Sequence, residues 1–303
     1  MVRAWQLPQN WTERQLIEGR AHSEELFRQE RKEEGPRAFE GVYAEVEPRV
    51  REALELTDDL LNLTGQVFIF DSSLWKVLRY FCAPPVSEED LWTLVGQKFS
   101  NRIPEVLADD TAEVIREVLD PVRFSWARER RKPTETERES AVMATSALLA
   151  LELLRTRRRG DASKRQEAEV AQALENIGYS LDPRRDDIDV LDVLTRRSFS
   201  RERKVAGAKC DVPIRIADGR LLAVECKVSN GPKNSWKRLI RECGGKSETW
   251  RQHFGTQVMT VAVLAGSFDL SCLERAQNMD GLWVFWQHDL DPLMEFINSI
   301  HSR

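Results

Sequence analysis

The feature that most constrains the fold is a pair of apolar segments that flank an Asp-Gly turn, with two acids and one lysine on them or directly beside them. The segments are residues 212–217 and 221–228, and Asp218-Gly219 lies between them. Asp-Gly between apolar runs is a strong signal for a turn that joins two antiparallel strands. Because charge is costly to bury unless it is paired or bound to a metal, the acids and the lysine on these strands need a common partner. The pattern therefore predicts a buried β-hairpin that contains a charged site.

The length of the turn decides whether the two acids can meet. Side chains alternate between the faces of a strand, so Glu225 and Lys227 point to the same face. A two-residue turn would place Asp211 opposite Cys226 and away from Glu225, whereas a three-residue loop places Asp211 opposite Glu225. In that loop Gly219 takes the left-handed position, which a residue without Cβ adopts readily. A shared site therefore predicts the three-residue loop.

Two carboxylates and a lysine on one face can support a specific chemistry. Carboxylate oxygens are hard ligands that suit Mg²⁺, and a neighbouring lysine can orient or deprotonate a water or stabilise a phosphoryl transition state. The combination suggests metal-assisted cleavage of a phosphodiester. The alternative is that Asp211 and Glu225 lie at strand ends in water and Lys227 forms a surface ion pair. The spacing alone leaves both interpretations open, because the pattern is degenerate.

Asp211, Glu225 and Lys227 resemble the signature of the PD-(D/E)XK nuclease superfamily. The longer sequence resembles one branch of it, the XamI-type restriction endonucleases. The similarity is dense over the last third of the chain and thin before residue 120, and Cys210 stands where the superfamily name has proline, a position that varies. The similar residues are 209–211, 218–221, 225–230, 234–235, 237–239, 257–258, 262–266 and 286–290, with weaker matches at 123–126 and 133–134.

The resemblance implies roles for individual residues. Asp211, Glu225 and Lys227 are expected to be catalytic, with both acids and the main-chain carbonyl of Cys226 as ligands of Mg²⁺. Alternation turns the Cys226 thiol away from the site. Glu167 is a further candidate ligand, since the first core helix of the superfamily often supplies an acid. The alternative is an ordinary glutamate in the first turn of a helix.

The implied activity is that of a type II restriction endonuclease, which hydrolyses both strands of double-stranded DNA at a specific sequence and leaves 5′-phosphate ends. A two-fold dimer matches a near-palindromic site, so we expect a homodimer. A cognate DNA methyltransferase would act on the same site without forming a stable complex. Two other classes are open: a structure-selective repair or junction nuclease, and a non-catalytic DNA-binding protein whose acids are structural.

Charge is distributed unevenly along the chain. The formal net charge is −5, but residues 155–251 hold 23 Lys and Arg against 15 Asp and Glu, while the remainder holds 22 against 35. A basic segment around the motif in an acidic protein favours a polyanionic partner. The basic run at residues 155–159, taken alone, is equally consistent with a solvated linker.

The segment directly after the motif strand is the expected DNA contact. Gly231-Pro232 bends the chain, and the N-terminus of the following helix can hold an anion. Amide, hydroxyl and basic side chains here can reach phosphates or base edges. An ordinary loop with Ser or Asn as a helix cap is the alternative. The candidate DNA-binding residues are Asn230, Lys233, Asn234, Ser235, Lys237 and Arg238.

The expected fold is an α/β class: a core with a mixed β-sheet flanked by helices at residues 159–303, plus a mainly helical region at residues 1–158. A capping box from Thr134 to Glu137 predicts a helix that ends near residue 154, and the second region is expected to begin near Gly160. The other helices expected are 13–34, 45–63, one starting after Ser87, 163–177, 234–241, 247–254 and 291–300. The strands expected besides the hairpin are 188–194, 257–265 and 281–286.

No segment approaches the roughly 18–20 apolar residues that span a bilayer. The first residues lack the apolar core of a signal peptide. Five scattered cysteines without a Cys-x-x-Cys pair indicate reduced thiols and no zinc site. We therefore expect a cytoplasmic enzyme without a membrane partner.

Overall fold

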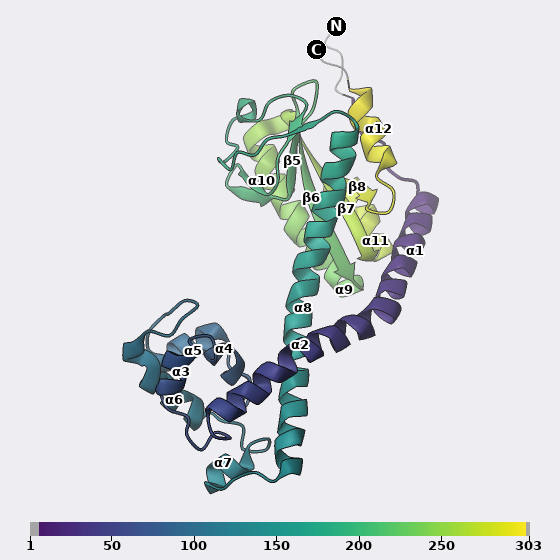
Figure 1. The fold of residues 1–303 in the computed structure, drawn as a ribbon. Helices are drawn as coiled ribbons and strands as arrows, with labels where there is room; N and C mark the ends of the chain where they lie inside the picture. The colour runs from purple at the N-terminus through teal and green to yellow at the C-terminus, as the bar shows by residue number, and fades with distance from the viewer. Residues whose placement is uncertain (1–5, 301–303) are drawn as a thin grey trace. The chain divides into compact units, whose positions relative to one another are not determined.

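The structure, a computed structural model, describes residues 6–300 and forms two compact units (Figure 1). The sheet unit comprises Met1–Glu33 and Arg158–Arg303, and the helical unit comprises Glu34–Arg157. This division differs from the expected 1–158 and 159–303 in one respect, because the N-terminal residues belong with the sheet. None of the helices formed by residues 6–300 combines the length and apolar composition that a membrane span requires.

The helical unit is built around a core of aromatic and aliphatic side chains, in which Phe81 stacks on Phe124 and Trp126 packs edge-on against Phe124. The expected helix start after Ser87 is confirmed, with a capping box between Ser87 and Asp90. Its helices are α2 (Gly35–Leu56), α3 (Gln66–Phe70), α4 (Trp75–Leu78), α5 (Glu88–Val95), α6 (Ala108–Glu117), α7 (Ser125–Glu129) and the first part of α8 (Glu135–Asn176).

Helix α8 is one uninterrupted helix of 42 residues. Its capping box is confirmed: the Glu137 N–H donates to Thr134 Oγ1, and the Thr134 N–H donates to the Glu137 carboxylate. The predicted end near residue 154 is wrong, because the run 155–159 is helical. The expected start of the second region near Gly160 lies within this helix, close to the division between Arg157 and Arg158. A single glycine costs a helix only about 1 kcal/mol, and no proline occurs within α8 to force an end.

The sheet unit contains a six-stranded mixed sheet, which confirms the expected α/β class with flanking helices. β5 and β6 are antiparallel, whereas β6, β7 and β8 are mutually parallel. In sheet order the strands are β1 (Ser180–Leu181), β2 (Ser198–Phe199), β5 (Val212–Arg215), β6 (Leu221–Asn230), β7 (Val258–Ser267) and β8 (Leu282–Trp286). A separate hairpin consists of β3 (Arg203–Val205) and β4 (Ala208–Cys210).

The strand expected at residues 188–194 is wrong. Only Ile188 forms an isolated bridge, to Val205, and Leu191–Val193 is a short 3₁₀ helix. The apolar side chains of this stretch explain the error. Ile188, Leu191 and Leu194 are buried in a cluster beneath the β3–β4 hairpin, so they are apolar because they pack, without pairing as a strand.

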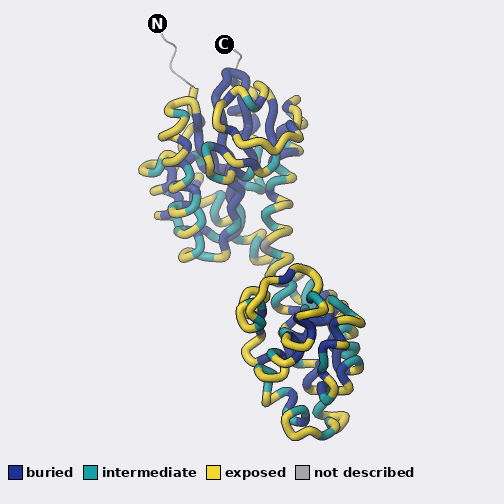
Figure 2. Tube along the Cα trace, turned by 90° about the vertical axis from the view of Figure 1, so that its left-hand side faces the viewer, coloured by how far each residue is buried: buried dark blue, intermediate teal, exposed yellow. Residues whose placement is uncertain are grey.

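The two faces of the sheet are covered by different helices. Most strand residues are buried, and buried backbone runs through the interior of the sheet unit in Figure 2. On one face, Val170 and Leu174 of α8 pack in a cluster with Val224 of β6. On the other face, Trp250 of α10 (Gly245–Phe254) packs with Ala223 of β6. Side chains alternate along β6, so Glu225 and Lys227 follow Ala223 toward α10. The remaining helices of this unit are α1 (Glu13–Gln29), α9 (Pro232–Ser235), α11 (Leu270–Asn278) and α12 (Asp291–Ser299).

Helix α1 docks closely on the sheet. Leu16 is buried with Ala262 and Leu264 of β7, and the Ser23 hydroxyl donates a hydrogen bond to the Gly266 carbonyl at 2.9 Å. A Cβ atom added at Gly19 would lie only 2.2 Å from the indole nitrogen of Trp286. Gly19 is therefore required by close packing.

We expect Gly19→Ala to lower the free energy of unfolding of the sheet unit by about 1–3 kcal/mol, because the buried Trp286 must move to make room. The matched control is Gly41→Ala in α2, where an added Cβ meets no atom within 4 Å. That change should stabilise the helix by about 1 kcal/mol. Thermal unfolding of both variants checks the prediction, and an increase in unfolding temperature for Gly19→Ala would refute the close docking of α1.

Candidate active site

The β5–β6 hairpin has the three-residue loop that a shared site requires. Val212 is paired with Val224 in the antiparallel ladder. The Ile216 N–H donates to the Arg220 carbonyl at 3.0 Å, and the Gly219 N–H donates to the Ile216 carbonyl at 3.0 Å. Gly219 has a φ of 96°, in the left-handed region. The predicted loop of residues 217–219 is therefore confirmed.

This register brings Asp211, Glu225 and Lys227 together. Asp211 directly precedes β5, and one further step of the ladder puts it opposite Glu225. Lys227 Nζ lies 2.8 Å from Asp211 Oδ2 and 2.7 Å from Glu225 Oε2. The side chain of Glu225 is fully buried, and those of Lys227 and Asp211 are 9% and 13% exposed. The alternative in which the acids lie at strand ends in water does not fit these positions.

Cys226 contributes its backbone to this site. Its N–H donates a 2.8 Å hydrogen bond to Asp211 Oδ2, while its thiol is buried in the cluster on the opposite face with Val224. In an antiparallel ladder the N–H and C=O of one residue point to the same neighbouring strand. The Cys226 carbonyl therefore points toward the side of Asp211, as its candidate role requires.

Lys246 is part of the same cluster, although it was not among the residues predicted from the sequence. Its Nζ atom lies 2.9 Å from Glu225 Oε1 and 2.8 Å from Oε2. The residue is the second of α10 and lies 21 residues beyond Glu225. A contact made by a helix that folds back over a strand has no local sequence signature, so only the basic composition of residues 155–251 pointed toward it.

The burial of the cluster changes its acid–base properties. Burial raises the pKa of Glu225, and the neighbouring charges of Lys227 and Lys246 only partly oppose this effect. For Lys227, burial works to lower the pKa, but the charges of Glu225 and Asp211 outweigh burial and the net pKa is raised. Lys227 is therefore held in its charged form, in which it donates hydrogen bonds and does not accept a proton.

Glu167 lies on α8, close enough to Asp211 for the two charges to interact. Its pKa is raised, chiefly by burial and in part by the charge of Asp211, and Ser163 Oγ donates to its Oε1 atom at 2.9 Å. Among residues 6–300, however, His, Cys, Asp and Glu side chains do not gather in threes around a possible metal position. The structure thus brings Asp211 and Glu225 together but keeps Glu167 outside a compact ligand set.

The donor set fits a hard divalent cation. Asp211 and Glu225 offer carboxylate oxygens on either side of one ammonium group, and the Cys226 carbonyl faces the same side. Mg²⁺ keeps several waters and typically takes one or two protein carboxylates together with substrate phosphates. Two acids and a carbonyl are therefore sufficient, and a third carboxylate is not required.

The predicted DNA-binding residues have different surroundings. Lys233 and Lys237 are exposed and lie in the continuous helical segment from α9 through the π-helix Trp236–Gly244. Arg238 pairs with Glu242 at 3.3 Å, Asn230 Oδ1 accepts from Arg31 at 3.3 Å, and Asn234 is partly exposed.

Ser235 is the exception among these candidates. It is fully buried, and its hydroxyl donates to the Pro232 carbonyl at 2.6 Å and accepts from the Asp269 N–H at 3.3 Å. Because both hydrogen bonds are internal, its hydroxyl helps to fasten the turn after β6 to the start of α11. It is not exposed for contact with DNA.

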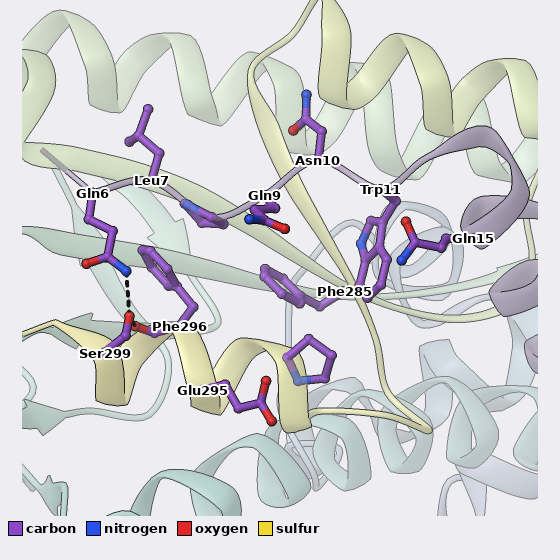
Figure 3. Close-up of a pocket in the computed structure, with 12 residues that line it drawn as sticks. Gln6, Leu7, Gln9, Asn10, Trp11, Gln15, Phe285, Glu295, Phe296 and Ser299 are labelled. Atoms are coloured by element: carbon purple, nitrogen blue, oxygen red, sulfur yellow. Dashed lines mark hydrogen bonds between the residues drawn. The ribbon is translucent and has the colours of Figure 1, made fainter.

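A separate pocket of about 460 Å³ lies between the N-terminal segment and α12 (Figure 3). Among the residues that the structure describes, Glu295 is the only charged one that lines it, and the Gln6 amide donates to Ser299 Oγ at 2.7 Å across one end. It contains none of the predicted site residues. The acids of the hairpin therefore belong to a different part of the sheet unit.

Comparisons with known proteins identify the family of the chain. Residues 58–286 match the sequence profile of a family described as XamI restriction endonuclease. The chain is also 31% identical over 258 residues to the Type II restriction enzyme XamI of Xanthomonas campestris pv. amaranthicola, which covers 82% of this chain and 93% of that protein. No solved structure matches the chain. The profile extends upstream of residue 120, so it includes most of the helical unit as well as the hairpin.

Proposed function

Since the chain belongs to the XamI restriction endonuclease family, we propose that it is a Mg²⁺-dependent type II site-specific deoxyribonuclease of the PD-(D/E)XK kind. The observation that carries the proposal is the buried cluster in which Lys227 contacts both Asp211 and Glu225. The mixed sheet, its flanking helices and the N-terminal helical region are consistent with a restriction endonuclease fold. The substrate is double-stranded DNA.

The predicted catalytic and metal-binding residues have separate roles in this mechanism. Asp211, Glu225 and the Cys226 carbonyl would hold the metal, with Glu167 as a further acid nearby. A bound Mg²⁺ supplies positive charge that polarises the phosphate and lowers the pKa of a water molecule. Lys227 is fixed between the acids, where it orients the attacking water and stabilises negative charge on the phosphate.

The reaction consumes one water for each strand that is cut. The water oxygen attacks phosphorus in line with the leaving 3′ oxygen, and the bond between phosphorus and that oxygen breaks. The products are a 3′ hydroxyl and a 5′-phosphate end. A two-fold homodimer would supply one site for each strand, and it matches the symmetry of a near-palindromic sequence. A methyltransferase that modifies the same sequence would act separately.

Digestion of plasmid DNA tests the function directly. With Mg²⁺ the protein should convert plasmid into discrete fragments, and EDTA should prevent this. Sequencing the fragment ends gives the recognition sequence and the position of the 5′ phosphate. A smear or structure-dependent nicking would instead indicate a repair or junction nuclease, and binding without cleavage would indicate a non-catalytic DNA-binding protein.

The helical segment after β6 should contact the DNA. We expect Lys237→Ala or Arg238→Ala to weaken binding to cognate and scrambled duplexes alike, and to reduce the salt slope by roughly one unit, as loss of a phosphate contact does. Loss of a base contact at Asn234 or Lys233 should cost about 1–3 kcal/mol on the cognate duplex only. Binding titrations at several salt concentrations, with Ca²⁺ in place of Mg²⁺, distinguish these patterns. If all four variants bind both duplexes like the unsubstituted protein, the segment is only a connector.

A further inference from the structure

Two lysines neutralise the acidic pair, and they are held in different ways. Lys227 belongs to β6, contacts both acids and is 9% exposed. Lys246 comes from α10, contacts Glu225 and is 27% exposed. Lys227 is therefore fixed inside the cluster, whereas the ammonium group of Lys246 reaches Glu225 from the solvent side.

The cluster is electrically balanced without a metal. Asp211 and Glu225 carry two negative charges, and Lys227 and Lys246 carry two positive charges. Glu225 has no exposed surface, and a buried carboxylate without partners is costly. Lys246 therefore supports the fold before any cation is bound.

The same contact opposes metal binding. Lys246 lies within 2.9 Å of both carboxylate oxygens of Glu225, which are the atoms that a metal would use. A divalent cation at these oxygens and an ammonium group beside them would repel each other strongly in a buried site. Lys246 and the divalent cation therefore compete for these oxygens, and Lys246, whose side chain is 27% exposed, can move out into solvent.

We propose that Lys246 is an exchangeable counter-ion of Glu225. It pairs with this carboxylate in the metal-free protein and leaves when a divalent cation binds Glu225 and Asp211. The inference rests on the proposed metal-dependent function and adds a positioning residue that sets the metal affinity of the site. Lys227 stays in place through the exchange, because its ammonium group also contacts Asp211 and its side chain is only 9% exposed.

The test is the binding of Mg²⁺ alone, without DNA, to the full chain. Lys246→Met keeps the length of the side chain and removes its charge. We expect this variant to unfold at a lower temperature in EDTA and to bind Mg²⁺ about tenfold more tightly in calorimetric titration. Mg²⁺ should consequently raise its unfolding temperature by more than it raises that of the unsubstituted protein. Lys204→Met, at a lysine of β3 whose side chain is 55% exposed, is the control and should change neither quantity.

A second variant keeps the test decisive if Lys246→Met does not fold. Lys246→Arg retains the charge and can hold both oxygens of Glu225 through two N–H groups. It should keep its unfolding temperature in EDTA and bind Mg²⁺ more weakly than the unsubstituted protein. A Mg²⁺ affinity that neither variant changes would overturn the proposal while leaving the proposed function intact, provided that the unsubstituted protein cuts plasmid. A protein that neither binds Mg²⁺ nor cuts DNA would overturn both.

Discussion

Asp211→Asn should abolish DNA cleavage, with a loss of roughly three orders of magnitude or more, and should leave the fold and DNA binding nearly unchanged. The substitution removes a charged metal ligand but retains an oxygen that can accept from the Cys226 N–H. Loss of one negative charge should also reduce repulsion of the DNA phosphates, so binding in the absence of metal should stay equal or become tighter. Plasmid digestion in Mg²⁺ and duplex titration in EDTA measure the two effects.

Glu225→Gln should be equally inactive but less stable. Glu225 is buried and is contacted by Lys227 and Lys246, so its neutralisation leaves Lys246 without its carboxylate and Lys227 with Asp211 alone. We therefore expect a lower unfolding temperature for Glu225→Gln than for Asp211→Asn, whose side chain lies nearer the surface. Cleavage at the unsubstituted rate by Asp211→Asn would end the assignment of the acids to metal binding.

Lys227→Ala should lose activity by several orders of magnitude while still binding Mg²⁺. The substitution removes the ammonium group that orients water and stabilises charge, but it leaves both acids in place. Removal of a positive charge beside the acids should, if anything, favour a divalent cation. Single-turnover cleavage at saturating Mg²⁺ and calorimetric Mg²⁺ titration separate the chemical step from metal binding.

Cys226→Ser is the adjacent control for this prediction. Its side chain packs in the apolar cluster on the opposite face of the sheet, so the hydroxyl should cost stability, at about 1–3 kcal/mol for a buried polar group without a partner. Its carbonyl is unchanged, and cleavage should stay close to that of the unsubstituted protein. A folded Cys226→Ser variant with a larger catalytic defect than Lys227→Ala would show that the faces of β6 are assigned wrongly.

The sequence was sufficient to predict structural features that depend on neighbouring residues in the chain. The hairpin register followed from side-chain alternation and from the need to bring Asp211 and Glu225 together, and the apolar runs of β7 and β8 were recognisable as strands. These features depend on residues a few positions apart, or on burial that leaves a periodic pattern. The sequence therefore predicted the part of the site that the hairpin supplies, which is Asp211, Glu225 and Lys227.

The sequence was insufficient to predict contacts between segments that are far apart in the chain. Lys246 reaches Glu225 because α10 crosses the strand, and Ser235 is buried because its hydroxyl bonds to the start of α11. Gly19 in α1 is required by a tryptophan at the other end of the chain. None of these contacts changes the local pattern of polar and apolar residues, so propensity and periodicity could not reveal them.

The two separate stretches of the sheet unit also affect the order in which the molecule can be made. During synthesis the helical unit, Glu34–Arg157, emerges as one continuous stretch and can fold as a unit. Helix α1 emerges before it, yet Leu16 has no surface to cover until β7 is complete. β6, which carries Glu225 and Lys227, likewise lacks its parallel neighbour until then. A ribosome that stops before Val258 would thus release a fragment in which the edge of β6 that carries Glu225 and Lys227 is unpaired.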